Sequence, residues 1–432
     1  MRRRSLQALL FALLATPSFA VERFPAPEFT QGYRFPETLT PHPRAEVFSY
    51  VDVAVLVATL ALAAYLILRR RSRRETALLV VFSLLYFGFF RRGCICAIGS
   101  IQNVALAAGS SDYALPVAAG AFFLLPLLFA LLAGRVFCAA VCPLGAAQEL
   151  VLLRPVRVPP WLDQALATLP YLYLGAAVLF AATGSAFLIC QYDPFVLFFR
   201  LGGSTGMLLF GIAMLLAGTF IGRPYCRYLC PYSVLLSLLS PFAKWRVTIT
   251  PSGCRNCHQC AGSCPYGAIR APTEGADTER APEYRGRLAV LWVLLPIMVL
   301  LGAWLVGLNS PVLAQVHPRV RLAQRVWLEE QGLVEGKTEE SEAFDALGLP
   351  SVDLYREAAA IRSEFDTGSW VLGAWIGLVF GLRMITLSAR RHRDGYEPDP
   401  ATCLACCRCY ASCPVGRADE SAQARANREE RR

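Results

Sequence analysis

Cys254-Arg-Asn-Cys257-His-Gln-Cys260-Ala-Gly-Ser-Cys264-Pro265 is the stretch that decides how the rest of this chain must fold. Its cysteines are separated by two, two and three residues and are followed by a proline, the spacing typical of a [4Fe–4S] binding run in bacterial ferredoxins. Thiolates suit such clusters because they are soft, charged donors. The run recurs downstream as Cys403-Leu-Ala-Cys406-Cys407-Arg-Cys409-Tyr-Ala-Ser-Cys413-Pro414. Two matched runs predict a ferredoxin-like domain with two [4Fe–4S] clusters, assembled from two separated segments.

In two-cluster ferredoxins the fourth cysteine of each run serves the other cluster. The predicted ligands are therefore Cys254, Cys257, Cys260 and Cys413 for one cluster, and Cys403, Cys406, Cys409 and Cys264 for the other. Structural zinc is the alternative, since four cysteines also bind zinc, but two runs that share their closing prolines favour clusters. Cys407 has no place in the pattern. The long segment between the runs must leave this site and return to it.

The composition is that of a membrane protein. Of 432 residues, 55% are hydrophobic and only 17% are charged, and the mean hydropathy is +0.43. Most arginines flank apolar spans, so the net charge of +10 reflects membrane orientation and does not indicate a nucleic-acid partner. Sixteen cysteines in these spacings indicate metal and redox chemistry, not a disulfide framework.

Residues 1–20 combine Met1-Arg-Arg-Arg, an apolar run and Ser18-Phe19-Ala20, the layout of a secretory signal peptide. An uncleaved membrane anchor is the alternative. Residues 21–49 are Pro-rich and aperiodic and are expected to form a short periplasmic segment.

A polytopic α-helical protein with about seven spans is expected, because a span needs roughly 20 apolar residues. The predicted spans are 50–68, 75–90, 114–133, 165–188, 204–222, 288–307 and 368–388. Five arginines at 69–74 place the end of the first span in the cytoplasm. The protein is thus expected in a bacterial inner membrane, with a periplasmic N-terminus and a cytoplasmic C-terminus.

This orientation divides the chain into functional parts. They are a membrane domain at 50–242, a first ferredoxin-like segment at 243–287, a hairpin of two spans at 288–388 with a periplasmic loop at 308–367, and a second ferredoxin-like segment at 389–432. Segments 91–113 and 189–203 also fall outside, and 134–164 falls inside. Arg91 and Arg92 do not fit the charge rule, and they line a partner or substrate path or extend towards the membrane interface.

Two segments share a Cys-x-x-x-Cys-Pro box: Gly134-Arg-Val-Phe-Cys138-Ala-Ala-Val-Cys142-Pro-Leu-Gly145 and Gly222-Arg-Pro-Tyr-Cys226-Arg-Tyr-Leu-Cys230-Pro231. Residues four apart share one face of a helical turn, so each box presents two thiols together. Cys138, Cys142, Cys226 and Cys230 are candidates for a third metal or iron–sulfur centre, a dithiol pair or a docking surface for the ferredoxin-like domain. Inert buried cysteines are the alternative.

A third copy, Arg92-Gly-Cys94-Ile-Cys96-Ala-Ile-Gly99, lacks the proline and falls on the predicted outer side, as does Cys190. Cys94, Cys96 and Cys190 therefore form either an outer redox or metal site or, in an oxidising compartment, a disulfide between two of them. Gln102 and Gln148 each follow the last cysteine of their copy by six residues.

Several stretches resemble the membrane and ferredoxin half of the NosR/NirI family. They are Cys142-Pro-Leu-Gly-Ala-Ala-Gln-Glu149, Tyr225-Cys-Arg-Tyr-Leu-Cys-Pro231, His317-Pro-Arg-Val-Arg-Leu-Ala323, Ser341-Glu-Ala-Phe344 and Tyr396-Glu-Pro-Asp399. NapH and CcoG are similar but less close. The resemblance implies an inner-membrane iron–sulfur protein of denitrification that passes electrons towards periplasmic nitrous oxide reductase or supports its copper centres. Full NosR proteins carry a periplasmic FMN-binding domain before the first span. No FMN site is identified here, so either a separate flavoprotein fills that role or the electron route differs.

The cysteine runs and the resemblance together predict an electron-transfer protein that links cytoplasmic [4Fe–4S] clusters or the quinol pool to a periplasmic acceptor. The resemblance implies a quinol dehydrogenase-like subunit that supports nitrous oxide reductase. The alternative is an assembly or maturation factor for copper centres that works through redox thiols.

Overall fold

The structure is a computed structural model and describes residues 46–93, 96–111, 113–200, 202, 204–249, 257–272, 281–389 and 395–414. The chain divides into two units, Met1–Ala45 and Glu46–Arg432, and all described residues belong to the second. The predicted signal peptide, most of the segment at 21–49, and the two cysteines Cys94 and Cys254 lie outside the described residues.

Four helical stretches in the described residues are long and apolar enough to cross a membrane: Val47–Arg70, Pro160–Ala182, Gly286–Gly307 and Ser351–Ser388. They support the prediction of a helical membrane protein. The other three predicted spans correspond to shorter helices, namely α3 (Arg73–Ser83) continued by the π-helix η2 (Leu84–Phe90), α5 (Val117–Ala133) and α11 (Thr205–Phe220). The count of seven spans stays a prediction.

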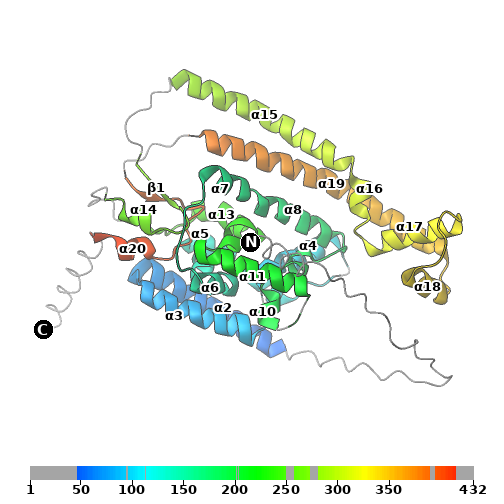
Figure 1. Cartoon of the computed structure of the whole chain (residues 1–432), viewed down its shortest axis with the longest axis horizontal. Helices are drawn as coiled ribbons and strands as arrows, with labels where there is room; N and C mark the ends of the chain where they lie inside the picture. The colour runs from blue at the N-terminus through cyan, green and yellow to red at the C-terminus, as the bar shows by residue number, and fades with distance from the viewer. Residues whose placement is uncertain are drawn as a thin grey trace, which may run out of the picture. The chain divides into compact units, whose positions relative to one another are not determined.

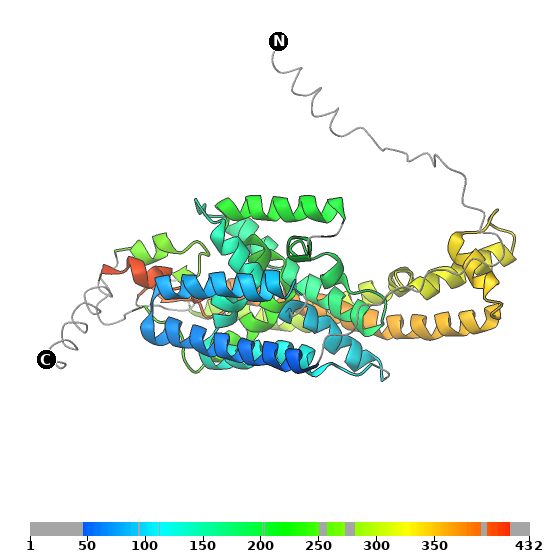
Figure 2. The same ribbon diagram turned by 90° about the horizontal axis from the view of Figure 1, so that it is seen from below.

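The first predicted span and the second lie side by side as a hairpin (Figure 2). Helix α2 (Glu46–Tyr65) continues as the π-helix η1 (Leu66–Arg70), and α3 follows after a turn at Arg71. At the far end of this hairpin, Arg91 forms an ion pair of 2.7 Å with Asp52, whose side chain is fully buried. Tyr86 donates a second hydrogen bond to the same carboxylate, at 2.9 Å. Arg91 is therefore paired with a carboxylate inside the bundle, as ionisable groups in membrane proteins usually are.

Two apolar helices lie where the sequence analysis expected non-membrane segments. Helix α4 (Ala97–Gly109) packs against α5 and α8 (Leu169–Ala182), and α13 (Pro231–Leu239) packs against the same two helices. Both are shorter than a membrane span, so a search for roughly 20 apolar residues does not detect them. The remaining helices of this region are η3 (Phe137–Val141), α6 (Pro143–Leu150), α7 (Pro160–Leu166), α9 (Leu188–Gln191), α10 (Val196–Arg200), α12 (Pro224–Tyr228) and η4 (Ser240–Phe242).

Helices α15 (Ala281–Gly307) and α19 (Ser351–Ser388) pack side by side along their length (Figure 1). A Cβ added at Gly302 would lie 2.4 Å from the Gly373 carbonyl oxygen, and one at Gly377 would lie 2.1 Å from that of Met298. Glycines four residues apart on α19, at 373, 377 and 381, thus let the two backbones touch.

The segment between these two helices is helical as well. It contains α16 (Ser310–Ala314), α17 (Pro318–Glu330) and α18 (Glu339–Ala346). Val320, Phe344 and Phe365 form a small core with the first half of α19. Helix α19 therefore begins at Ser351 and not near residue 368, because its first half covers α17 and α18 instead of lipid.

The α15–α19 hairpin returns the chain to the first ferredoxin-like segment. Strand β1 (Ile269–Arg270) pairs antiparallel with β2 (Glu397–Pro398), with Ile269 opposite Pro398. The short helices α14 (Gln259–Ser263) and α20 (Arg408–Ser412), one from each cysteine run, pack against each other (Figure 2). The expectation that the two segments meet is confirmed.

Gly377→Ala is expected to lower the free energy of unfolding by about 1–3 kcal/mol, because the new methyl group must push α15 away. Gly286→Ala is the matched control, since it lies on α15 with open space around its Cβ position and gains only helix propensity. Unfolding of the two purified variants in detergent by added denaturant would measure both changes. Equal stability of the two variants would show that the glycine contact is not needed.

Candidate metal centres

Four cysteines of the second run and one of the first line one cavity, together with Tyr266. They are Cys264, Cys403, Cys406, Cys407 and Cys409. The thiols of Cys264, Cys403, Cys406 and Cys409 also interact electrostatically with one another. These four are the cysteines that crossed ligation requires for one cluster, and Cys407 is the one lining cysteine without a place in that pattern.

The chemistry of this cavity fits a [4Fe–4S] cluster. Its donors are four thiols, the ligand type that such clusters take. Among the described residues, no three histidine, cysteine or acidic side chains converge on a single ion. A cubane cluster does not need such convergence, because each iron takes its own thiolate. The assignment of these cysteines as ligands stays a prediction, and it names Cys264, Cys403, Cys406 and Cys409 as the residues that would hold the group.

The other predicted cluster is described only in part. Cys260 is buried, Cys257 is exposed and Cys413 is half-buried, whereas Cys254 lies outside the described residues. Cys260 packs with Tyr396 of the second segment, and the Tyr396 hydroxyl hydrogen-bonds Nδ1 of His258. Tyr396 of the second segment therefore helps to hold the first run in place.

Cys407, which has no place in the cluster pattern, is buried against the membrane domain. Its thiol donates to the Ile67 carbonyl in η1, at 3.8 Å, and its backbone φ of 60° turns the chain into α20. Next to it, the Arg71 guanidinium lies 4.3 Å from the centre of the Tyr410 ring. The arginine-rich turn after the first span and the second cysteine run therefore lie on the same side of the protein.

The two Cys-x-x-x-Cys-Pro boxes are brought together. All four thiols are buried, and the Cys142 and Cys230 thiols both interact electrostatically with Cys138 and Cys226. Cys142 and Cys230 are the N-caps of α6 and α13, and each is followed by proline at the first helical position, where proline is favoured. The Cys-Pro pairs thus start two helices and fix where each box ends.

Gln148 fixes one box against the other. Its side-chain N–H donates to Cys226 Sγ at 3.4 Å, and its carbonyl oxygen accepts the Tyr225 N–H at 2.9 Å. Gln102 acts similarly in the third copy, because its side-chain oxygen accepts the backbone N–H of Cys190 at 3.1 Å. The spacing that the two glutamines share in the sequence therefore reflects a shared structural role.

Cys96 lies beside the boxes. It is the N-cap of α4, interacts electrostatically with Cys190 and Asp193, and lines an apolar cavity together with Cys142. The sequence analysis placed Cys96 and Cys142 at opposite membrane faces. In the structure they share a cavity, because η3 and the start of α6 are buried in the core. No disulfide joins Cys96 to Cys190 in the described residues, and the alternatives for an outer site stay predictions.

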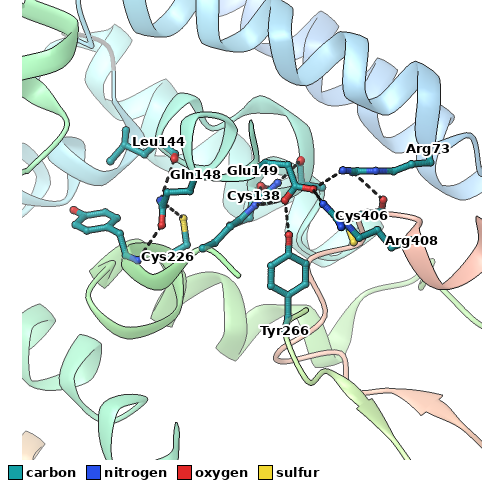
Figure 3. Close-up of polar contacts among 12 residues, drawn as sticks. Arg73, Cys138, Leu144, Gln148, Glu149, Cys226, Tyr266, Cys406 and Arg408 are labelled. Carbon is teal, nitrogen blue, oxygen red and sulfur yellow. Dashed lines mark hydrogen bonds and ion pairs between the residues drawn. The ribbon is translucent and has the colours of Figure 1, made fainter. Parts of the chain in front are cut away.

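A buried carboxylate joins the boxes to the cluster cavity (Figure 3). The Glu149 side chain on α6 is 4% exposed and forms ion pairs with three arginines. Arg223 lies at 3.1 Å and Arg408 at 2.8 Å, and Arg73 is the third. The Tyr266 hydroxyl donates to the same carboxylate at 2.5 Å.

Burial opposes ionisation of Glu149, but the arginines and the Tyr266 hydroxyl outweigh it and hold the pKa of this carboxyl well below its usual range. Glu149 is therefore an anion at any physiological pH. The junction that it forms is called the Glu149 cage below and consists of Arg73, Glu149, Arg223, Tyr266 and Arg408.

The sequence analysis did not identify this cage. One signal was present, because both boxes begin with Gly-Arg. Arg223 of the second box donates to the carbonyl of Ala139, at 3.1 Å, and to that of Cys138. Arg135 of the first box donates to the Ala401 carbonyl, at 2.8 Å, beside the second cysteine run. The repeated arginines thus connect each box to a neighbouring segment.

A protein-family match covers both boxes. A family model described as a 4Fe-4S binding domain matches residues 115–159 and 204–250. These two stretches contain the Cys138/Cys142 and Cys226/Cys230 boxes and lie outside both ferredoxin-like runs. The match supports [4Fe–4S] binding by this chain, and the number of clusters stays a prediction.

Comparison with curated proteins gives related electron-transfer and NosR-type proteins. The putative electron transport protein YccM of Escherichia coli is 31% identical over 37% of this chain and 48% of its own length. Protein NirI of Paracoccus denitrificans is 33% identical over 31% of this chain and 21% of its own. Regulatory protein NosR of Pseudomonas aeruginosa is 29% identical over 50% and 33%. The chain thus covers less than half of each relative. No solved structure matches it.

These relatives confirm the resemblance to NosR/NirI-type iron–sulfur proteins. They also confirm the coarser prediction that the chain is related to membrane iron–sulfur proteins of electron transport.

Crossed ligation predicts that Cys264→Ala removes the same cluster as Cys406→Ala, with a loss of about four irons per chain. Iron analysis and EPR of the reduced variants would measure this, with Cys257→Ala as the reference for the other cluster. Cys407→Ala is the matched control and should retain both signals. An EPR spectrum of Cys264→Ala that matches Cys257→Ala instead would show that each run holds its own cluster.

Proposed function

We propose that this chain is an inner-membrane electron-transfer protein that passes electrons between a two-cluster ferredoxin-like domain and a centre at the Cys-x-x-x-Cys-Pro boxes. The single observation that carries the proposal is the Glu149 cage, which joins the Cys264/Cys403/Cys406/Cys409 cavity to the box that contains Cys138. Two redox centres must lie close together to exchange electrons. A buried ionic junction between the two predicted ligand sets would hold the two centres close together.

The chain's own residues would hold and shield these groups. Cys264, Cys403, Cys406 and Cys409 are proposed for one cluster, and Cys254, Cys257, Cys260 and Cys413 for the other. A [4Fe–4S] cluster, when bound, supplies one-electron redox chemistry. Tyr266 and Leu404 line the first cavity with apolar surface and would limit the access of water, which is one determinant of reduction potential.

The boxes are proposed to hold a third centre. Cys138, Cys142, Cys226 and Cys230 are buried and mutually close, and the 4Fe-4S family match covers both boxes. Cys96 and Cys142 share one cavity, so Cys96 and Cys190 are proposed to continue the route away from the ferredoxin-like domain. Tyr225, the residue before Cys226, is buried with its ring against Phe195.

The partners are proposed from the resemblance to NosR. A quinol or a separate flavoprotein would exchange electrons with the chain, and a periplasmic reductase would be the acceptor, with nitrous oxide reductase as the acceptor that the resemblance implies. The similarity to YccM, a putative electron transport protein, supports the general role.

If the four box thiols form one centre, Cys142→Ser and Cys230→Ser should each abolish electron passage, and the double variant should be no worse. Residues that act as one unit behave non-additively in this way. The measurement is reduction of an external acceptor by the protein in sealed vesicles, after EPR has shown that both ferredoxin-like clusters are intact.

Cys407→Ser serves as the control, because this cysteine is also buried but belongs to neither box. A near-normal rate in either box variant would exclude a shared centre. Stoichiometric copper at Cys96 or Cys190, with no loss of electron passage on cluster removal, would favour the copper-assembly alternative.

The proposed orientation predicts where fused reporters work. A reporter after Arg432 should be active only if it functions in the cytoplasm, and one inserted at 332–337, between α17 and α18, only if it functions in the periplasm. A periplasm-specific reporter that is active after Arg432 would overturn the orientation.

A further inference from the structure

We propose that the Glu149 cage sets the reduction potentials of the two centres that it separates, through its excess of positive charge, in addition to holding them together. Glu149 and its arginines are thus positioning and tuning residues for electron transfer. The inference rests on the proposed function, because it requires centres at the flanking cysteines.

The first support is an unbroken chain of polar contacts from one predicted ligand set to the other (Figure 3). Arg73 donates to the carbonyl of Cys406, at 3.3 Å, and also pairs with Glu149. On the other side of Glu149, Arg223 pairs with the carboxylate and donates to the carbonyl of Cys138. The cage therefore touches the backbone of one cysteine in each set.

The second support is the balance of charge. Three guanidinium groups surround one carboxylate, and the Arg223 side chain is fully buried. A fourth guanidinium, that of Arg135, lies 3.9 Å from Cys138 Sγ. The Arg73 and Arg408 side chains are about a quarter exposed, whereas those of Arg223 and Arg135 are buried. Without a cluster, two buried guanidinium groups would face one buried carboxylate and leave positive charge uncompensated in the protein interior, which is costly. A cluster held by thiolates is anionic, so a centre on each side would supply the missing negative charge.

The consequence for redox chemistry follows from electrostatics. Reduction adds a negative charge to a cluster, and nearby positive charge favours the reduced state, which raises the potential. Burial limits the screening of this interaction by salt and water. The cage should therefore make the adjacent cluster easier to reduce than the cluster held by Cys254, Cys257, Cys260 and Cys413.

Two substitutions with opposite charge effects test the inference. Glu149→Gln removes a negative charge and should raise the potential of the adjacent cluster. Arg408→Gln removes a positive charge and should lower it. Glu75→Gln is the matched control, because Glu75 also pairs with an arginine, Arg70, but at an exposed site.

The measurement is an EPR-monitored redox titration of the full-length protein in detergent, after iron analysis has shown normal loading. The expected shifts are on the order of tenfold in the reduction equilibrium, about 59 mV for one electron, with opposite signs for Glu149→Gln and Arg408→Gln. Glu75→Gln should match the wild type. Shifts of the same sign, or no larger than in Glu75→Gln, would show that the cage is only structural.

The outcomes separate this inference from the proposed function. Absence of iron and of EPR signals in the wild-type protein would overturn the proposed function itself, whereas normal signals with unmoved potentials would overturn only the inference. If Glu149→Gln does not load iron, Arg73→Gln takes its place beside Arg408→Gln. Both variants should then lower the potential, and an unchanged potential in both would refute the tuning role.

Discussion

The ionic contacts of the Glu149 carboxylate are the constraint on which the rest of this structure depends. A buried charge is tolerated only when it is paired and hydrogen-bonded. Its partners come from separate parts of the chain: Arg73 follows the first span, Arg223 belongs to the second box, Tyr266 follows the first cysteine run and Arg408 lies in the second run. Each segment contributes one contact to the same buried carboxylate, so the carboxylate couples the assembly of the four segments.

The membrane part provides the geometry that this junction needs. Cys142 and Cys230 start helices at the N-caps of α6 and α13, which fixes the direction of both boxes. The close contact of α15 with α19 then delivers the second cysteine run to the first, where the β1–β2 pair locks the register. The Cys-Pro helix starts and the close contact between α15 and α19 thus both contribute to the geometry of this one site.

Much of this arrangement could be predicted from the sequence. Regular cysteine spacing reflects the ligand needs of a cluster, and long apolar runs reflect the thickness of a membrane. The meeting of the two runs and the helical membrane domain followed from them. Helix α4 and the proximity of Cys96 to Cys142 could not be predicted, because a short helix buried among others has no run of span length in the sequence. The role of Glu149 was also hidden, since its ion pairs join residues that lie far apart in the sequence and have no fixed spacing.

The division of the ferredoxin-like domain into two parts has a consequence for biosynthesis. The strand pair β1–β2 joins residues on either side of the α15–α19 hairpin. A growing chain exposes its N-terminal parts first, so the first cysteine run leaves the ribosome well before its partner strand exists. Closure of the domain therefore has to wait until α15 and α19 have both been made. Until then the first run lacks the contacts that the second segment provides, among them the strand pair and the hydrogen bond between Tyr396 and His258.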